Sequence, residues 1–190
     1  MIAEMRESLQ TVLGPDVSEP VLLAGGASKE AWAVDAGGER LLVRRAAVGV
    51  IHRHTLSLAE EFAVLEAAYE AGVKVPRPIM YVADLEGREA FVMERLEGET
   101  IGRRIVRMDV PAALPRQLAE ELAKIHAIPP ERVPFLVEAR LERMVAELDD
   151  VGEPHPAIEL GLWWLRENRP PPRAPVVTHG DYRIDRKSVV

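Results

Sequence analysis

The stretch SLAEEFAVLEAAYEAGVKVPRP, residues 57–78, carries the signals of one well-bounded helix. Ser57 and Glu60 have the spacing of a capping box, in which each side chain satisfies an unpaired backbone N–H of the first turn. Apolar residues then recur at helical spacing, and Gly72 stands where a left-handed C-cap belongs. The prolines that follow forbid further helix. At about 100° per residue, Glu61 lies at an edge of the apolar stripe, from which it can reach a neighbouring sheet.

Strand-like segments flank this helix on both sides. Glycine turns separate three of them before the helix, and two more follow it, joined by a turn at residues 85–87. Beyond residue 98 the apolar residues recur at helical spacing. Strands segregated from helices favour an α+β fold in two lobes. The predicted strands are 21–23, 30–35, 39–45, 77–84 and 88–96, and the other predicted helices are 3–13, 114–128, 136–149 and 156–168.

The composition is that of an ordinary globular protein of 190 residues, with 47 % hydrophobic and 29 % charged residues. A net charge of −7 argues against nucleic acid or an anionic membrane surface as the main partner. The chain has no cysteine, which excludes disulfides and thiolate metal sites and agrees with a reducing cytoplasm. No apolar stretch is long enough to span a bilayer, and the N-terminus lacks the apolar core of a signal peptide. We therefore expect a cytoplasmic protein without nucleic-acid or membrane partners.

Seven segments share a characteristic order along the chain: GGASKEAW (25–32), LLVRR (41–45), EEFAVLEAAYEAGVKVPRP (60–78), FVMERLEG (91–98), LAEELAKIHAI (118–128), WWLRENRPPP (163–172) and VTHGDYRI (177–184). In this order they resemble the aminoglycoside phosphotransferase family, and most of all its branch of kinase-like domains fused to some acyl-CoA dehydrogenases. The resemblance covers residues 20–184 and implies a protein-kinase-like fold in two lobes. Residues 1–97 would form an N-lobe with a five-stranded antiparallel sheet and one inserted helix, and residues 98–184 a partial helical C-lobe.

The resemblance implies transfer of the γ-phosphate of ATP (or GTP), with Mg²⁺, to a hydroxyl of a small molecule. Such a site needs a backbone cradle and a cation for the phosphates. The backbone cradle for the phosphates would be the turn AGGASK, which contains Gly25 and Gly26. Taken by itself, this turn is more typical of a simple hairpin. Arg44 would be the cation, and strand alternation places it with Leu42 on one face, opposite to Leu41, Val43 and Arg45. The residues implied in nucleotide binding are Gly25, Gly26, Ser28, Arg44, Glu61, Met93, Glu94 and Leu96.

Each of these residues also has a simpler interpretation. Arg44 taken alone is an exposed cation on an edge strand, and Glu61 one more solvated helix charge. The resemblance instead pairs Glu61 with Arg44, and it makes residues 93–96 the linker whose backbone bonds adenine. The tryptophans 163 and 164 are most simply packing residues, with one ring inward and the other at a boundary.

The sequence THGDYRI, residues 178–184, matches the opening of the family's catalytic loop. By this resemblance Asp181 orients and deprotonates the acceptor hydroxyl, and His179 braces the loop. The family's metal-binding asparagine falls at Arg186, and a cation there repels Mg²⁺, so we expect no metal ligand at that position.

The last six residues, 185–190, depart from the family pattern and read as an aberrant tail. We favour a truncated reading frame and expect this chain to be inactive or nearly so. The alternative is a natural short form, a non-catalytic module that binds nucleotide or a partner.

Overall fold

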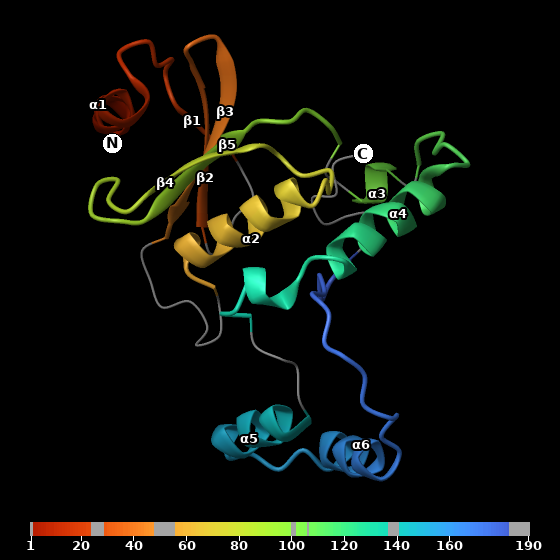
Figure 1. The fold of residues 1–190 in the computed structure, drawn as a ribbon. Helices are drawn as coiled ribbons and strands as arrows, with labels where there is room; N and C mark the ends of the chain where they lie inside the picture. Colours follow the sequence, from red (N-terminus) through yellow and green to blue (C-terminus); the bar gives the residue numbers. More distant parts are fainter. Residues whose placement is uncertain are drawn as a thin grey trace.

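The computed structural model describes residues 2–23, 29–47, 56–99, 102–105, 107–136 and 141–182. A five-stranded antiparallel sheet, in the order β1-β2-β3-β5-β4, is followed along the chain by helices (Figure 1). The strands are β1 (Val21–Leu22), β2 (Lys29–Ala36), β3 (Glu39–Ala46), β4 (Pro78–Val82) and β5 (Ala90–Glu94). The helices are α1 (Ile2–Leu13), α2 (Leu58–Glu70), α3 (Gly102–Ile105), α4 (Leu114–His126), α5 (Leu141–Val151) and α6 (Pro156–Glu167), with a 3₁₀ turn η1 (Pro130–Arg132).

The α+β prediction, with five antiparallel strands and one helix inserted after the third, is confirmed. Within the described residues, the strands lie before residue 95 and the helices α3 to α6 after residue 101. The short elements α3 and η1 were not predicted, because three or four residues are too few to show a periodicity.

The hairpin between β2 and β3 fixes which residues share a face of the sheet. Its turn consists of Gly37 and Gly38, with φ of 57° and 81°, and such positive values suit a two-residue hairpin turn. The resulting register pairs Ala31 with Arg44. Because directly opposed residues share a face, Arg44 lies on one side of the sheet and Arg45 on the other. The predicted alternation along β3 is confirmed.

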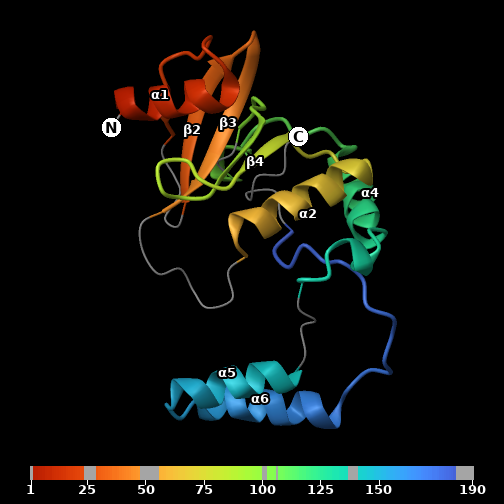
Figure 2. The ribbon, with the colours of Figure 1, turned by 60° about the vertical axis from the view of Figure 1, so that its left-hand side comes forward.

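Each face of the sheet is covered by one helix, α1 on one side and α2 on the other (Figure 2). On the α1 side, here called the outer face, Met5 and Leu9 are buried against Trp32, Val43 and Val92. On the α2 side, here called the inner face, buried aromatic residues join helix and sheet, and the rings of Phe62 and Phe91 are 5.7 Å apart. Burying both faces in this way stabilises the sheet and fixes the position of α2 against β4 and β5.

Helix α2 has the ends that its sequence predicts. The side chain of Ser57 accepts from the backbone of Glu60, whose carboxylate accepts from the backbone of Ser57, and Gly72 has a φ of 73°. The C-terminal half of α2 packs against the later part of the chain, with Ala67, Ala68 and Val73 in one cluster with Ile128, Val133 and Val177. The helix therefore joins the sheet to the segment that carries His179 and Asp181.

Helices α5 and α6 pack against each other and stand apart from the sheet and α4 (Figures 1 and 2). The prediction that one ring of the tryptophan pair points inward was wrong, since Trp163 and Trp164 are 57 % and 56 % exposed. Leu162 is the buried residue of α6, whereas the two tryptophans that follow it remain open to solvent. No helix in the described ranges is both long and apolar enough to cross a membrane.

Candidate active site

Arg44 and Glu61, predicted to pair, lie together at the inner face. Nη2 of Arg44 on β3 is 3.4 Å from Oε2 of Glu61 on α2, and the two side chains are 21 % and 25 % exposed. The Arg44 guanidinium also lies over the Phe91 ring, 5.9 Å from its centroid. Sheet register and helix packing thus hold a cation beside a carboxylate while both remain partly open to solvent.

A second cation, which the sequence analysis did not select, shares this carboxylate. Nζ of Lys29, the first residue of β2, contacts Oε1 of Glu61 more closely than Arg44 contacts Oε2. Lys29 is only 7 % exposed. The β2–β3 register could have identified it, because Lys29 is two residues from Ala31, the partner of Arg44, and therefore on the same face. We call Lys29, Arg44 and Glu61 the inner charge cluster.

Apolar side chains line the inner face on both sides of Arg44. Val21 of β1 is exposed and pairs with Ala33. Leu23 is exposed too, and its N–H donates to the carbonyl of Ala31 at 2.9 Å. Leu42 and Met93 pair across β3 and β5 on the same face. The inner face thus offers a flat apolar surface next to a charged cluster.

The predicted linker is only partly available to a ligand. The backbone N–H of Glu94 donates to Arg77 at 2.9 Å, and that of Arg95 donates to Arg40 at 2.9 Å. Leu96 is exposed, and its N–H has no hydrogen-bond partner among the described residues. Of the backbone amides at Glu94 and Leu96, the Leu96 N–H is therefore the candidate hydrogen-bond donor to a ligand.

The predicted catalytic loop is tied to itself and to α4. Nδ1 of His179 accepts a hydrogen bond from the Asp181 N–H at 3.3 Å, an arrangement suited to a bracing histidine. The hydroxyl of Tyr182 donates to the Leu118 carbonyl at 2.8 Å, and its ring meets that of His179 edge-on at 5.5 Å. Burial, aided by the nearby Glu121 charge, raises the pKa of Tyr182, so the hydroxyl remains a donor. These contacts hold the backbone on either side of the exposed Asp181.

The other sequence-predicted positions, Gly25, Gly26, Ser28 and Arg186, lie outside the described residues. Across the ranges that the structure does describe, no three His, Asp or Glu side chains gather closely enough to hold a metal ion. No residue in these ranges is therefore named as a metal ligand, and no step of the chemistry is assigned to a metal.

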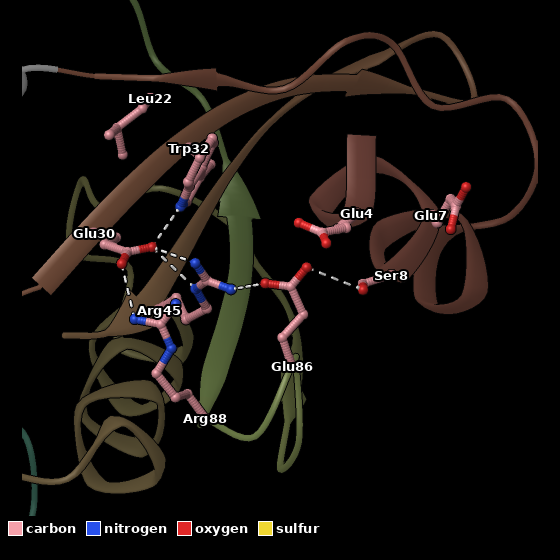
Figure 3. A pocket seen from close by; sticks show the side chains of 9 residues that line it. All are labelled: Glu4, Glu7, Ser8, Leu22, Glu30, Trp32, Arg45, Glu86 and Arg88. Carbon is pink, nitrogen blue, oxygen red and sulfur yellow. Dashed lines mark hydrogen bonds and ion pairs between the residues drawn. The ribbon is translucent and has the colours of Figure 1, made fainter. Parts of the chain in front are cut away.

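The outer face carries a second set of charges. Arg45, with a side chain 3 % exposed, binds Glu30 on β2 and Glu86 in the β4–β5 turn, and its guanidinium lies 5.8 Å from the Trp32 ring centroid. Arg88 binds the other oxygen of Glu30 at 2.8 Å. Figure 3 shows these side chains around a depression of about 670 Å³ that also borders α1. We call Glu30, Arg45, Glu86 and Arg88 the outer charge cluster.

Glu30 is the centre of the outer charge cluster. Burial alone would raise the pKa of Glu30, but hydrogen bonds from Trp32, Arg45 and Arg88 outweigh it and lower the pKa to about 2. The carboxylate is thus ionised at neutral pH and balances the buried guanidinium. Since the polar groups of this cluster bind one another, its arrangement is that of a structural network rather than an open site.

Residues 20–185 match the phosphotransferase enzyme family. The chain belongs to this family. Among phosphotransferase relatives of known structure, a protein from Ralstonia eutropha, provisionally described as an aminoglycoside phosphotransferase, superposes with a TM-score of 0.71 and 18 % identity. The superposition covers 96 % of this chain and 59 % of that one. This likeness confirms the protein-kinase-like fold.

Two other similarities extend this comparison. Spectinomycin phosphotransferase, solved with ADP and spectinomycin, superposes with a TM-score of 0.57 and 13 % identity, over 88 % of this chain and 53 % of that one. Acyl-CoA dehydrogenase family member 11 from Gallus gallus is 25 % identical over 85 % of this chain, which spans 23 % of that protein. This chain therefore corresponds to only part of each relative.

Proposed function

We propose that this chain provides the nucleotide-binding part, and the beginning of the catalytic loop, of a phosphotransferase that acts on a small molecule. The donor would be ATP (or GTP), and the acceptor a hydroxyl group. The pairing of Arg44 with Glu61 at the inner face is the observation that carries the proposal. Partial exposure leaves the guanidinium able to contact phosphate oxygens, for which its planar fork is well suited.

The nucleotide would lie along the inner face. A flat base fits the apolar surface formed by Val21, Leu23, Leu42 and Met93, and the Leu96 N–H offers it a hydrogen bond. The phosphates would then extend toward Arg44, whose direction Glu61 holds. Spectinomycin phosphotransferase, which shares the fold, is known with bound ADP, and this supports a nucleotide as the ligand. We assign residues 1–97 to this nucleotide-binding lobe and residues 98–184 to the lobe with the catalytic loop.

In the transfer itself, the acceptor oxygen forms a bond to the γ-phosphorus while the bond from that phosphorus to the β–γ bridging oxygen breaks. The acceptor proton passes to the Asp181 carboxylate, and the nucleoside diphosphate leaves with the electron pair of the broken bond. His179 would hold the Asp181 backbone during this step through its Nδ1 contact.

Calorimetric titration of the 190-residue chain with AMP-PNP, a non-hydrolysable ATP analogue, tests this proposal, with GTP analogues run alongside. We expect saturable binding that weakens at least about tenfold in Arg44→Met, because a charged hydrogen bond to phosphate is lost. Arg116→Met is the matched control, since Arg116 is an exposed residue of α4 paired with Glu120. Absence of binding to the wild type, or equal binding by Arg44→Met, would contradict the proposal.

A further inference from the structure

Lys29 combines deep burial with a contact to the inner charge cluster. Its side chain is 6 % exposed, and Nζ contacts Glu61 and lies 3.4 Å from the carbonyl oxygen of Leu56. Lysine is seldom buried to this degree unless its charge is paired. Because Lys29 begins β2 and Glu61 lies in the first turn of α2, their contact joins the start of the strand to the start of the helix.

Two cations compete for the single carboxylate of Glu61. Lys29 has the closer contact, and Arg44 remains at 3.4 Å from the second oxygen. The formal charge of the three groups is +1, so the cluster retains an attraction for an anion. A guanidinium has five N–H donors, and the single carboxylate contact leaves Arg44 with donors to spare.

We infer that Lys29 is a positioning residue that occupies Glu61 and so keeps Arg44 available to an anionic ligand. If Lys29 were removed, Arg44 would be drawn onto both oxygens of Glu61, since the bidentate geometry is the stronger form of this pair. Its donors would then be directed at the helix instead of at a ligand. The identification of that ligand as a nucleotide phosphate chain rests on the proposed function; the competition for Glu61 does not.

Direct contact of Lys29 with the phosphates is the competing explanation. The structure argues against it, because the ammonium group is enclosed and already engaged with Glu61 and the Leu56 carbonyl. Arg44 is the more exposed of the two cations at this carboxylate. The two explanations differ in what a second substitution at Glu61 should do.

The first experiment needs no nucleotide. The folded protein is treated with phenylglyoxal, which modifies accessible guanidinium groups, and modification of Arg44 is followed by mass spectrometry. We expect Lys29→Met to slow the labelling of Arg44 about threefold or more, and Lys29→Met with Glu61→Gln to restore it, because the neutral amide no longer holds the guanidinium. Lys29→Arg should label at close to the wild-type rate.

Two further variants keep this experiment decisive. Lys124→Met removes a lysine that binds Glu121 on α4 and should leave Arg44 labelling unchanged. If Lys29→Met does not fold by circular dichroism, Lys29→Gln replaces it, since its amide can still donate to the Leu56 carbonyl. Equal labelling of Arg44 with and without Lys29 would overturn the inference, whatever the result with nucleotide.

The second experiment measures AMP-PNP affinity in the same variants. Lys29→Met should weaken binding about tenfold, and adding Glu61→Gln should recover part of that loss, because the amide oxygen can still direct Arg44 through one hydrogen bond but no longer draws it onto two oxygens. A double variant that binds as weakly as Lys29→Met would instead mean that Lys29 contacts the ligand directly, and the inference would be wrong. If the wild type binds no nucleotide, the proposed function fails, while the labelling experiment still decides the role of Lys29.

Discussion

Arg44 and Arg45 are adjacent in the chain, but their side chains extend from opposite faces of the sheet. Arg44 reaches Glu61 in the partly open inner charge cluster, whereas Arg45 is enclosed in the outer charge cluster. One residue type thus occupies two environments that differ in burial and in number of partners. Substitutions at the two positions should therefore separate ligand binding from stability.

Arg44→Met should strongly reduce the thermal shift produced by AMP-PNP and leave the ligand-free protein almost as stable as before. A partly exposed ion pair contributes about 1 kcal/mol or less, so the free energy of unfolding should change little. Differential scanning fluorimetry with and without the nucleotide measures both effects. An undiminished shift in Arg44→Met would contradict the assignment of Arg44 to phosphate.

Arg45→Met should have the converse effect and destabilise the protein by about 3 kcal/mol, because it leaves Glu30 and Glu86 without their buried partner. Urea unfolding followed by circular dichroism gives this difference. Arg143→Met is a suitable control, since Arg143 forms an i,i+4 pair with Glu147 on α5. A loss in Arg45→Met no larger than in the control would mean that the outer charge cluster does not stabilise the sheet.

Ionisation of Glu30 should make the free energy of unfolding depend on pH in the acid range. Its pKa falls from an ordinary value of 4.5 to about 2 in the folded protein, so the folded state favours the ionised form. The resulting stabilisation is fully present above pH 4.5 and is lost as the pH falls toward 2. We expect the stability difference between wild type and Glu30→Gln to shrink over this interval in urea titrations. A difference that stays constant from pH 6 to pH 3 would disagree with the lowered pKa.

Glu86 is held in a left-handed conformation, with φ of 57°, beside Gly87 in the β4–β5 turn. Asparagine tolerates this conformation better than glutamate, so the backbone effect of Glu86→Asn alone should raise the free energy of unfolding by about 1 kcal/mol. The same substitution also removes the ion pair with Arg45. Glu86→Asn should therefore destabilise the wild type and stabilise an Arg45→Met background. A double-mutant cycle by urea unfolding measures the change in the free energy of unfolding caused by Glu86→Asn in each background. Equal changes in both backgrounds would show that the Arg45 contact contributes nothing to stability.

Tyr182→Phe should loosen the segment that carries His179 and Asp181, because it deletes the hydrogen bond to the Leu118 carbonyl. The expected cost is about 1 kcal/mol, together with faster hydrogen exchange of backbone amides near residues 177–182. Tyr69→Phe is the control, since Tyr69 is an exposed residue of α2. Unchanged exchange in Tyr182→Phe would contradict the tether between the loop and α4.

The elements with strong local signals could be predicted from the sequence. The capping box at Ser57 and the glycine turns mark chain reversals by local chemistry, so α2 and the strands came out correctly. Alternation along β3 also placed Arg44 and Arg45 on the correct faces. The pairing of Arg44 with Glu61 was anticipated by the family resemblance and by the position of Glu61 at the edge of the apolar stripe.

Features that depend on pairing between distant segments could not be predicted in this way. Lys29 is unremarkable in sequence, and its importance follows only from the register of β2 on β3 and the packing of α2. The use of the Glu94 N–H likewise depends on pairing, in this case with the Arg77 carbonyl on the neighbouring segment. Trp163 and Trp164 were misjudged because hydrophobicity predicts burial only where another element covers the helix.

The glycine pair at residues 37 and 38 has an influence well beyond the hairpin that it closes. A shift of one residue in the β2–β3 pairing would send every side chain of β3 to the other side of the sheet. Arg45 would then face α2, and Arg44 would take its place beneath α1. Which of the two arginines lies on the face of Glu61 is thus encoded several residues away from that carboxylate. Mutational surveys limited to ligand-contacting positions would miss the two residues on which that choice depends.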